Sequence, residues 1–287
     1  MEIEVKGHSG CSIDIVTENS ELYIIKGSEN KDYINRLYQQ TEKQKQAEKQ
    51  EYRHIRIPHI YAIKKDNHSI KVKMEYIYSK NFIAYFETSG FEKMEYFITS
   101  ITTFIEEEIA RSKLSTIDTT IVQKKFEDIY KKIKENKFTG KDIEIDSLMK
   151  QSKVSFNLLP TQIEIPIGSC HGDLTFSNIL FNDTNYYLID FLDSFIESPL
   201  IDMVKIRQDT CYLWSTLMYA GTYDKLRMMI LAEKIDTNLN EIFSRYKWYR
   251  DYYHTFQIMN FLRIMQYAHE QPIINYLKKV ISNLVKI

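Results

Sequence analysis

The chain has 287 residues, 44% of them hydrophobic and 27% charged, which is typical of a folded globular protein large enough for two lobes. Its formal net charge of −1 argues against bulk attraction to nucleic acid or to an anionic membrane. No apolar run approaches the roughly 18 residues that a membrane-spanning helix needs, so we expect neither nucleic acid nor membrane as a partner.

The three cysteines, Cys11, Cys170 and Cys211, are widely spaced and show no metal-ligand pattern. Residues 1–4, Met-Glu-Ile-Glu, do not begin a signal peptide. We therefore expect reduced thiols and a cytoplasmic protein. The sequence makes no prediction about its oligomeric state.

The N-terminal part alternates apolar and polar residues in short runs that predict β-strands. These runs cover residues 2–5, 12–16 and 21–26. Residues 31–53 contain no Gly or Pro and place apolar residues at helical spacing, which predicts a helix. Two more strands are expected at 59–64 and 69–78, which completes a small antiparallel sheet of five strands with one helix.

From residue 82 the pattern becomes helical, and a regular apolar stripe runs from Met94 to Ile109. Further helices are predicted at 117–136, 144–152, 200–219, 223–235, 238–269 and 273–286, and short strands at 165–170 and 186–191. The fold class is therefore α+β and bilobal. We place the domain boundary between an N-terminal lobe, 1–78, and a larger, mostly helical lobe, 79–287.

One segment carries chemistry that ordinary packing does not require. It reads Cys-His-Gly-Asp-Leu-Thr-Phe-Ser-Asn from Cys170 to Asn178, and Ile-Asp-Phe follows at 189–191 after a turn at 182–185. An Asp, an Asn five residues later and a second Asp after a hairpin are the parts that phosphoryl transfer needs. One carboxylate serves the acceptor hydroxyl, and the other two side chains hold Mg²⁺.

This segment resembles the catalytic loop of the aminoglycoside phosphotransferase and choline kinase families, which share the protein-kinase-like fold. Ile189-Asp190-Phe191 is similar to their metal-binding segment. The resemblance implies that Asp173 is the general base and that His171 braces the backbone near the metal-binding Asp. Asn178 and Asp190 are implied as Mg²⁺ ligands. The cofactors implied are ATP or GTP, together with Mg²⁺.

Lys26, at the end of a Tyr-Ile-Ile-Lys strand, looks like the phosphate-binding lysine of these families. Such a lysine bridges the α- and β-phosphates and pairs with a helix glutamate. We expect Glu42 to be that partner, because it follows Lys26 by sixteen residues and shares a helix face with Ile34 and Tyr38. Glu48 is the alternative.

Two backbone segments are expected to touch the nucleotide. The loop at residues 7–12, with Ser9, Gly10 and Ser12, lies where backbone N–H groups would cover the phosphates, although it departs from the glycine pattern of protein kinases. The run from Met74 to Ile77 resembles the hinge that holds adenine through backbone groups. We therefore assign Glu75 and Ile77 to nucleotide binding.

These features predict an enzyme: an ATP- and Mg²⁺-dependent kinase acting on a hydroxyl of a small molecule such as an aminoglycoside, choline, ethanolamine or a sugar. A protein kinase is the less favoured alternative, because only eight residues separate Asp190 from Pro199 and leave no room for a peptide-docking segment. A nucleotide-binding pseudokinase is the other alternative. It is disfavoured because Lys26, Asp173, Asn178 and Asp190 are all present.

The acceptor is left open. Acidic residues after the metal-binding segment favour a cationic acceptor, whereas Lys205 and Arg207 in the same stretch favour an acidic one. Aromatic residues of the C-terminal helices either pack or form an acceptor cage. The acids are Asp193, Glu197, Asp202 and Asp209; the aromatics are Tyr212, Trp214, Tyr246, Trp248, Tyr249, Tyr252, Tyr253 and Phe256.

Overall fold

The computed structural model describes residues 11–182 and 185–286. The expected strand at 2–5, most of the loop at 7–12 and part of the turn at 182–185 lie outside the described residues. Grouped by their internal packing, the residues form two compact units. The first unit comprises residues 1–107, 171–194 and 223–228, and the second comprises 108–170, 195–222 and 229–287.

The first unit contains an antiparallel sheet with the order β1-β2-β5-β4. Its strands are β1 (Ser12–Glu18), β2 (Glu21–Ser28), β4 (Ile60–Lys65) and β5 (Ile70–Glu75). Four of the five predicted strands are therefore present, although β5 ends at Glu75 rather than at residue 78. Lys26 pairs with Ile13 on one side and with Val72 on the other, so the lysine belongs to a central strand.

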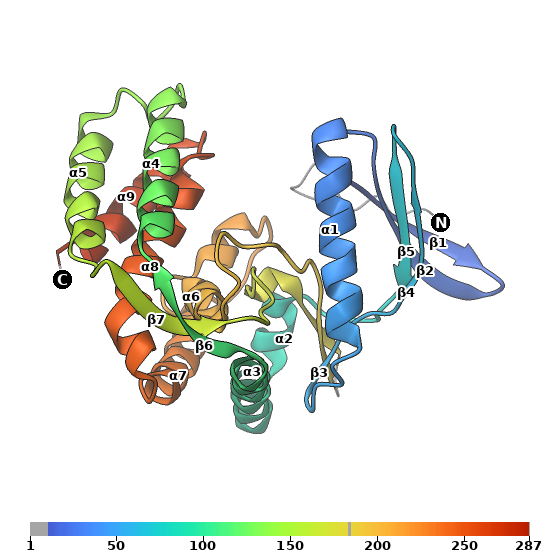
Figure 1. Ribbon diagram of the computed structural model, residues 1–287. Helices are drawn as coiled ribbons and strands as arrows, with labels where there is room; N and C mark the ends of the chain where they lie inside the picture. Colours follow the sequence, from blue (N-terminus) through green and yellow to red (C-terminus); the bar gives the residue numbers. More distant parts are fainter. Residues whose placement is uncertain (1–10, 183–184, 287) are drawn as a thin grey trace. The chain divides into compact units, whose positions relative to one another are not determined.

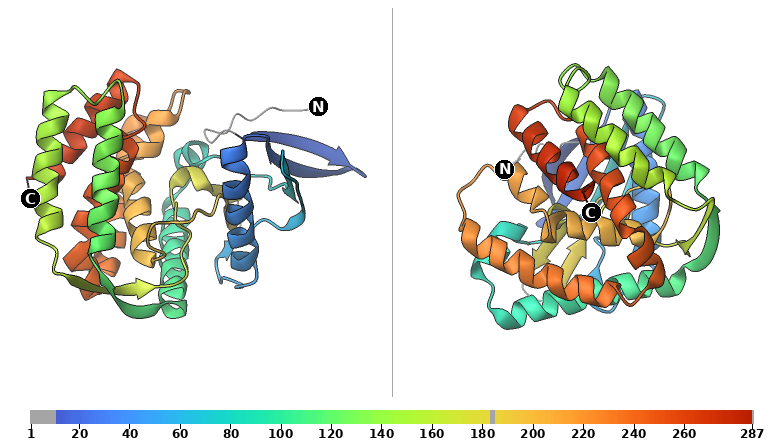
Figure 2. Two further views of the ribbon diagram at one scale, coloured as in Figure 1. Left: turned by 45° about the horizontal axis from the view of Figure 1, so that its top comes forward. Right: turned by 90° about the vertical axis from the view of Figure 1, so that its left-hand side faces the viewer.

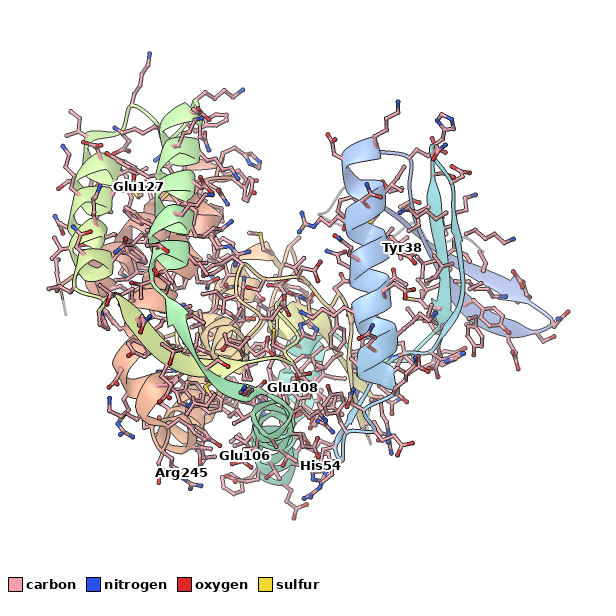
Figure 3. The ribbon with its side chains drawn as sticks, in the orientation of Figure 1. Tyr38, His54, Glu106, Glu108, Glu127 and Arg245 are labelled. Atoms are coloured by element: carbon pink, nitrogen blue, oxygen red, sulfur yellow. The ribbon has the colours of Figure 1, made fainter. Side chains whose placement is uncertain are left out.

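Helix α1 (Lys31–Glu48) lies along this sheet (Figure 1). Asn30 caps its first turn by accepting a hydrogen bond from the Asp32 N–H at 3.0 Å. Its apolar stripe, Tyr33, Ile34 and Leu37, packs with Ile70 and Val72 of β5 in a buried core. A second face meets β4: the ring of Tyr38, labelled in Figure 3, lies 4.4 Å from the Lys65 ammonium.

An aromatic core in the same unit supports the segment that the sequence predicts to be catalytic. Helices α2 (Phe82–Thr88) and α3 (Phe91–Arg111) pack against the hairpin of β8 (Ile179–Asn182) and β9 (Asn185–Leu188), and β9 also pairs in parallel with the short strand β3 (Ile55–Arg56). The rings of Phe86 and Phe176 lie 5.0 Å apart, and those of Tyr85 and Phe181 stack at 4.5 Å. Each such pair contributes about 0.5–1.5 kcal/mol beyond area burial, so these rings fix the backbone on both sides of Asn178.

The second unit is mostly helical. Helices α4 (Thr120–Glu135) and α5 (Ile143–Asn157) run side by side (Figure 2), and the rings of Phe126 and Phe156 meet at 4.6 Å. Glu127, labelled in Figure 3, accepts a hydrogen bond from Lys153 across this helix pair at 2.8 Å. The remaining helices are α6 (Pro199–Thr210), α7 (Lys225–Phe243), α8 (Lys247–Met265) and α9 (Gln271–Leu284), of which α7 belongs to this unit from Met229 onward.

The fold class is α+β, as predicted, but several boundaries were wrong. The largest correction concerns Ile117 and Asp118, which were placed in a helix and instead end strand β6 (Lys113–Asp118). This strand pairs with β7 (Gln162–Ile167), more than forty residues later, and local periodicity does not reveal such a pairing. The expected helix at 200–219 ends at Thr210, and a 3₁₀ turn follows at Trp214–Met218. No helix of the described residues is long and apolar enough to cross a membrane.

Candidate active site

Gly172 allows the loop of residues 170–178 to approach the segment of residues 189–192 closely. Its φ is +88°, and a Cβ added there would lie only 1.9 Å from the Leu192 carbonyl oxygen. Any side chain would therefore be both strained and blocked. Next to it, the Leu192 N–H donates to the His171 carbonyl at 2.9 Å. The two parts of the motif are thus joined through their backbones.

His171 is completely buried and has a hydrogen-bond partner at each ring nitrogen. The Asp173 N–H donates to Nδ1 at 3.1 Å, so the proton lies on Nε2, which is 2.9 Å from the Ile189 carbonyl oxygen and donates to it. Burial lowers the pKa of this imidazole to about 4, against the opposing charge of Asp173. A neutral histidine with both nitrogens engaged links the catalytic loop to the segment before Asp190 and has no proton-accepting atom to offer a substrate.

Asp173 is oriented by Asn178. The Asn178 side-chain amide donates to the Asp173 carbonyl at 2.8 Å and to its carboxylate Oδ2 at 3.0 Å. A 3₁₀ turn, Phe176–Asn178, brings the two residues together, with the Thr175 N–H donating to the Asp173 carbonyl at 2.8 Å. The Asn178 carbonyl in turn accepts from the Ile189 N–H at 3.1 Å. The partly exposed carboxylate of Asp173 is therefore held in one orientation.

Asp190 adopts a left-handed backbone conformation with φ of +62°, which is uncommon for a non-glycine residue. Its Oδ1 lies 2.6 Å from the Lys26 ammonium. The Lys26 side chain is 7% exposed and that of Asp190 is 44% exposed. Burial alone would lower the pKa of Lys26, but the charge and hydrogen bond of Asp190 outweigh it and raise that pKa. Lys26 is therefore charged, and Asp190 keeps one side open.

Glu42 does not pair with Lys26 in this structure, which corrects the expectation from the sequence. Its carboxylate lies 3.8 Å from Lys45 and lines a surface hollow with β4 residues such as Tyr61. Glu48, the alternative, pairs with His59 at 2.5 Å. The physical reason is the position of Glu42 around the helix. It lies one turn after Tyr38, on the face of α1 that is directed toward β4.

Lys43, one residue further on, is turned by about 100° around the helix and reaches the catalytic segment instead. Its ammonium donates to the Leu192 carbonyl at 2.8 Å. The sequence analysis did not single out this residue. The sequence places Lys43 on a different helical face from Tyr38 and Glu42. This position indicates a contact with residues 189–192 only once the face that packs on β4 is known.

The remaining nucleotide-site predictions stay predictions. Ser9 and Gly10 lie outside the described residues. Ser12 is exposed at the start of β1, with its hydroxyl 3.5 Å from the Gly27 carbonyl. Glu75 ends β5 and accepts a hydrogen bond from the His59 N–H at 3.0 Å, and Ile77 follows it, half-buried.

The oxygen atoms around Asp190 suit Mg²⁺ bound together with a nucleotide. Asn178 donates through Nδ2, which leaves its Oδ1 outside those bonds, and Asp190 uses Oδ1 for Lys26 and not Oδ2. Within residues 11–182 and 185–286 no group of three or more His, Cys, Asp or Glu side chains forms a metal cage. Mg²⁺ characteristically uses one or two protein carboxylates and completes its shell with phosphates and water, so this donor set fits.

Two of the charged residues that were considered for acceptor recognition, Arg207 and Asp209, make internal contacts instead. Arg207 pairs with Asp236 at 2.7 Å, and Asp209 accepts from the Ser215 N–H at 2.7 Å and from its hydroxyl at 2.9 Å. Both side chains are buried inside the second unit and are committed to internal contacts. Of the eight aromatic residues, Trp248, Tyr249 and Phe256 are also buried, as packing predicts.

No protein-family model and no curated protein matches this chain. Solved structures do match over nearly its whole length. The GDP and kanamycin complex of APH(2")-IIIa superposes with a TM-score of 0.62 at 14% identity, over 99% of this chain and 92% of that one. The complex of an APH(4)-Ia mutant with ADP and hygromycin B superposes with a TM-score of 0.59 at 10% identity, over 100% and 93%.

The chain has the fold of the aminoglycoside phosphotransferases. A third match, spectinomycin phosphotransferase APH(9)-Ia with ADP and spectinomycin, agrees, with a TM-score of 0.54 at 13% identity over 99% of this chain and 92% of that one. Identities this low establish the protein-kinase-like fold alone. The activity must therefore be argued from the site.

Proposed function

We propose that this protein is a nucleotide- and Mg²⁺-dependent phosphotransferase that moves the γ-phosphoryl group of ATP or GTP to a hydroxyl of a small molecule. One observation carries the proposal: a buried lysine and two carboxylates occur in a single hydrogen-bonded assembly. Lys26 holds Asp190 at 2.6 Å, while His171 and Asn178 link the segment before Asp190 to the loop that carries Asp173.

Asp173 acts as the general base. Its carboxylate accepts the proton of the acceptor hydroxyl as the oxygen attacks the γ-phosphorus and the bond to the β-phosphate oxygen breaks. Asn178 donates to the carboxylate oxygen Oδ2 and so keeps the carboxylate in one orientation for the acceptor. His171 stays neutral and orients the loop rather than exchanging a proton.

Lys26 and Asp190 handle the charge of the nucleotide. The Lys26 ammonium supplies a fixed positive charge toward the phosphates, and Asp190 with Asn178 supplies the oxygen ligands for Mg²⁺. The metal, when bound, would neutralise charge that develops on the phosphate oxygens. In the present structure the Lys26 ammonium is bonded to Asp190. When the nucleotide binds, its phosphates replace the Asp190 carboxylate as the partner of Lys26.

The acceptor class rests on analogy and on one feature of this chain. The matched structures are complexes of aminoglycoside or spectinomycin phosphotransferases with hygromycin B, spectinomycin or kanamycin. Only eight residues separate Asp190 from Pro199, the first residue of α6, which favours a small acceptor over a peptide. Aminoglycosides are therefore the first candidates, followed by choline, ethanolamine and sugars.

The test is a screen for transfer of the labelled γ-phosphoryl group to a panel of aminoglycosides, choline, ethanolamine, hexoses and nucleosides, with and without Mg²⁺. We expect a Mg²⁺-dependent phosphorylated product from at least one class. Tight binding of nucleotide with no transfer to any acceptor would instead favour the pseudokinase.

A further inference from the structure

The Leu192 peptide is clamped on two sides within the first unit. Its N–H donates to the His171 carbonyl at 2.9 Å, and its carbonyl accepts from the Lys43 ammonium at 2.8 Å. The same carbonyl oxygen lies against Gly172, where a Cβ would come within 1.9 Å of it and within 3.4 Å of the Lys43 nitrogen. Lys43 thus ties α1 to the point where the two parts of the catalytic motif meet.

This clamp lies two residues beyond Asp190, whose left-handed backbone has to be held by its surroundings. A non-glycine residue in that conformation persists only where neighbouring contacts over-determine it. The Ile189 N–H bond to the Asn178 carbonyl fixes the chain before Asp190. The Leu192 bonds fix it after Asp190. The side chains of His171 and Lys26 bond to Ile189 and to Asp190 itself. Lys43 adds the side-chain bond from α1, and it holds the chain after Asp190.

The helix face that carries Lys43 differs from the arrangement expected of a kinase. Within two turns of Lys43 the same face bears Arg36, Gln40 and Ala47 and no carboxylate. Lys26 takes its carboxylate from Asp190 instead of from α1. The contact between α1 and the site is therefore made by a cation and a backbone carbonyl.

We propose that Lys43 is a positioning residue of this phosphotransferase: its hydrogen bond to the Leu192 carbonyl fixes the segment that presents Asp190, the task expected of a helix glutamate paired with Lys26. The proposal rests on the proposed function for its catalytic consequence. Its structural consequence, the ordering of residues 189–193, is independent of turnover.

The chain offers a matched control on the same helix. Lys45 lies two residues further on, and its ammonium lies 3.8 Å from the Glu42 carboxylate on the face toward β4. Replacing either lysine by Met removes the same charge from the same helix. Only Lys43→Met removes the bond to Leu192, and Lys43→Gln serves if the Met variant does not fold.

Two measurements test the proposal. In the nucleotide-free protein, hydrogen exchange of the 189–193 amides should be faster in Lys43→Met than in wild type and unchanged in Lys45→Met. In turnover, the Mg²⁺ concentration for half-maximal rate should rise about 10-fold or more, because a hydrogen bond from a charged group is worth about 1.5–3 kcal/mol. Lys43→Arg should recover most of both effects, and Lys43→Glu should be at least as impaired as Lys43→Met.

Several results would overturn the proposal. Wild-type exchange in Lys43→Met, or equal effects of Lys43→Met and Lys45→Met, would show that the bond does not hold the segment. A Lys43→Glu variant as active as wild type would show that this face accepts the usual glutamate. If wild type transfers no phosphate to any acceptor, the proposed function fails, while the exchange comparison still decides whether Lys43 orders residues 189–193.

Discussion

Each compact unit contains a buried cation paired with a carboxylate, and the two pairs differ in how completely they are enclosed. In the first unit Lys26 meets Asp190 at 2.6 Å, and the carboxylate side chain is 44% exposed. In the second unit Arg207 meets Asp236 at 2.7 Å, and the two side chains are only 10% and 16% exposed. Distance alone would rank the pairs as equal.

The surroundings of Arg207 leave little for a ligand to contact. Its guanidinium donates to both Asp236 oxygens, at 2.8 and 2.7 Å, and to Asn240 and Tyr249 at 2.7 and 2.6 Å. Thr210 donates to Asp236 as well, at 2.7 Å. Such a saturated, bidentate pair joins α6, α7 and α8. We interpret it as structural.

The Lys26–Asp190 pair is joined by one hydrogen bond, to Oδ1 of Asp190, and keeps the other carboxylate oxygen for another partner. A pair that is buried at the cation and open at the anion can exchange partners when a nucleotide and a metal arrive. The two pairs therefore differ in the exposure and the remaining hydrogen-bonding capacity of the carboxylate, and not in distance. Breaking the open pair should impair binding, whereas breaking the closed pair should impair folding.

The largest expected effect lies next to the open pair. Asp173→Ala removes the proposed base and should lower phosphoryl transfer by about 10²–10⁴-fold, the usual contribution of general acid–base catalysis. The free energy of unfolding should change little, because the carboxylate is partly exposed. Steady-state turnover measures the loss of activity, and denaturant unfolding measures the free energy of unfolding. A variant with more than about a tenth of wild-type turnover would rule out this role for Asp173.

Breaking the closed pair should act on stability. Arg207→Met leaves Asp236 buried without its cation, and removing one partner of such a pair typically costs about 3–5 kcal/mol. Denaturant unfolding of the purified variant measures the change, and Lys247→Met, which breaks an exposed helix pair with Asp251, is the control. An Arg207→Met loss no larger than the control loss would show that the enclosed network is not structural.

The smallest expected effect concerns pH. His171 is neutral in the folded protein, with a pKa of about 4, whereas an unfolded histidine has a pKa of about 6.5. Between these values the unfolded chain binds the extra proton, so the free energy of unfolding should fall as pH decreases from about 6.5 to about 4, and the His171 contribution should level off below that.

Denaturant unfolding at about pH 7 and about pH 5 measures this slope. His171→Asn should flatten it, whereas the same change at His68, which lies in the exposed turn between β4 and β5, should not. Identical slopes for wild type and His171→Asn would contradict the burial of a neutral imidazole.

The sequence could predict that the residues of the proposed catalytic segment lie close together, because its information is local. His171, Gly172, Asp173 and Asn178 lie within one loop, and a short hairpin brings Asp190 to them, so spacing alone sets their proximity. The prediction that Glu42 pairs with Lys26 was wrong because neighbouring residues of α1 face different elements. Glu42 faces β4, and Lys43, the next residue, faces residues 189–192. The direction in which α1 packs depends on the whole sheet.

Non-local pairing explains the other failures. Strand β6 was missed because its partner β7 lies beyond two helices in the sequence. The Lys26–Asp190 pair spans 164 residues, and the sequence predicted both residues as functional without predicting that they would meet. A motif whose residues lie close together in the chain can be recognised from the sequence. An ion pair between residues of distant elements can be identified only once the fold is known.

We propose that Lys26, Asn178 and Asp190 form a Mg²⁺–nucleotide site. Titration of ATP or GTP into wild type and Asp190→Ala by calorimetry, with and without Mg²⁺, tests it most directly. We expect Mg²⁺-dependent binding to wild type that Asp190→Ala loses. Denaturant unfolding must show that the variant is folded during the titration, because removing Asp190 also leaves the buried Lys26 ammonium without its partner. Nucleotide binding that is indifferent to Mg²⁺, or equal in the two proteins, would contradict it.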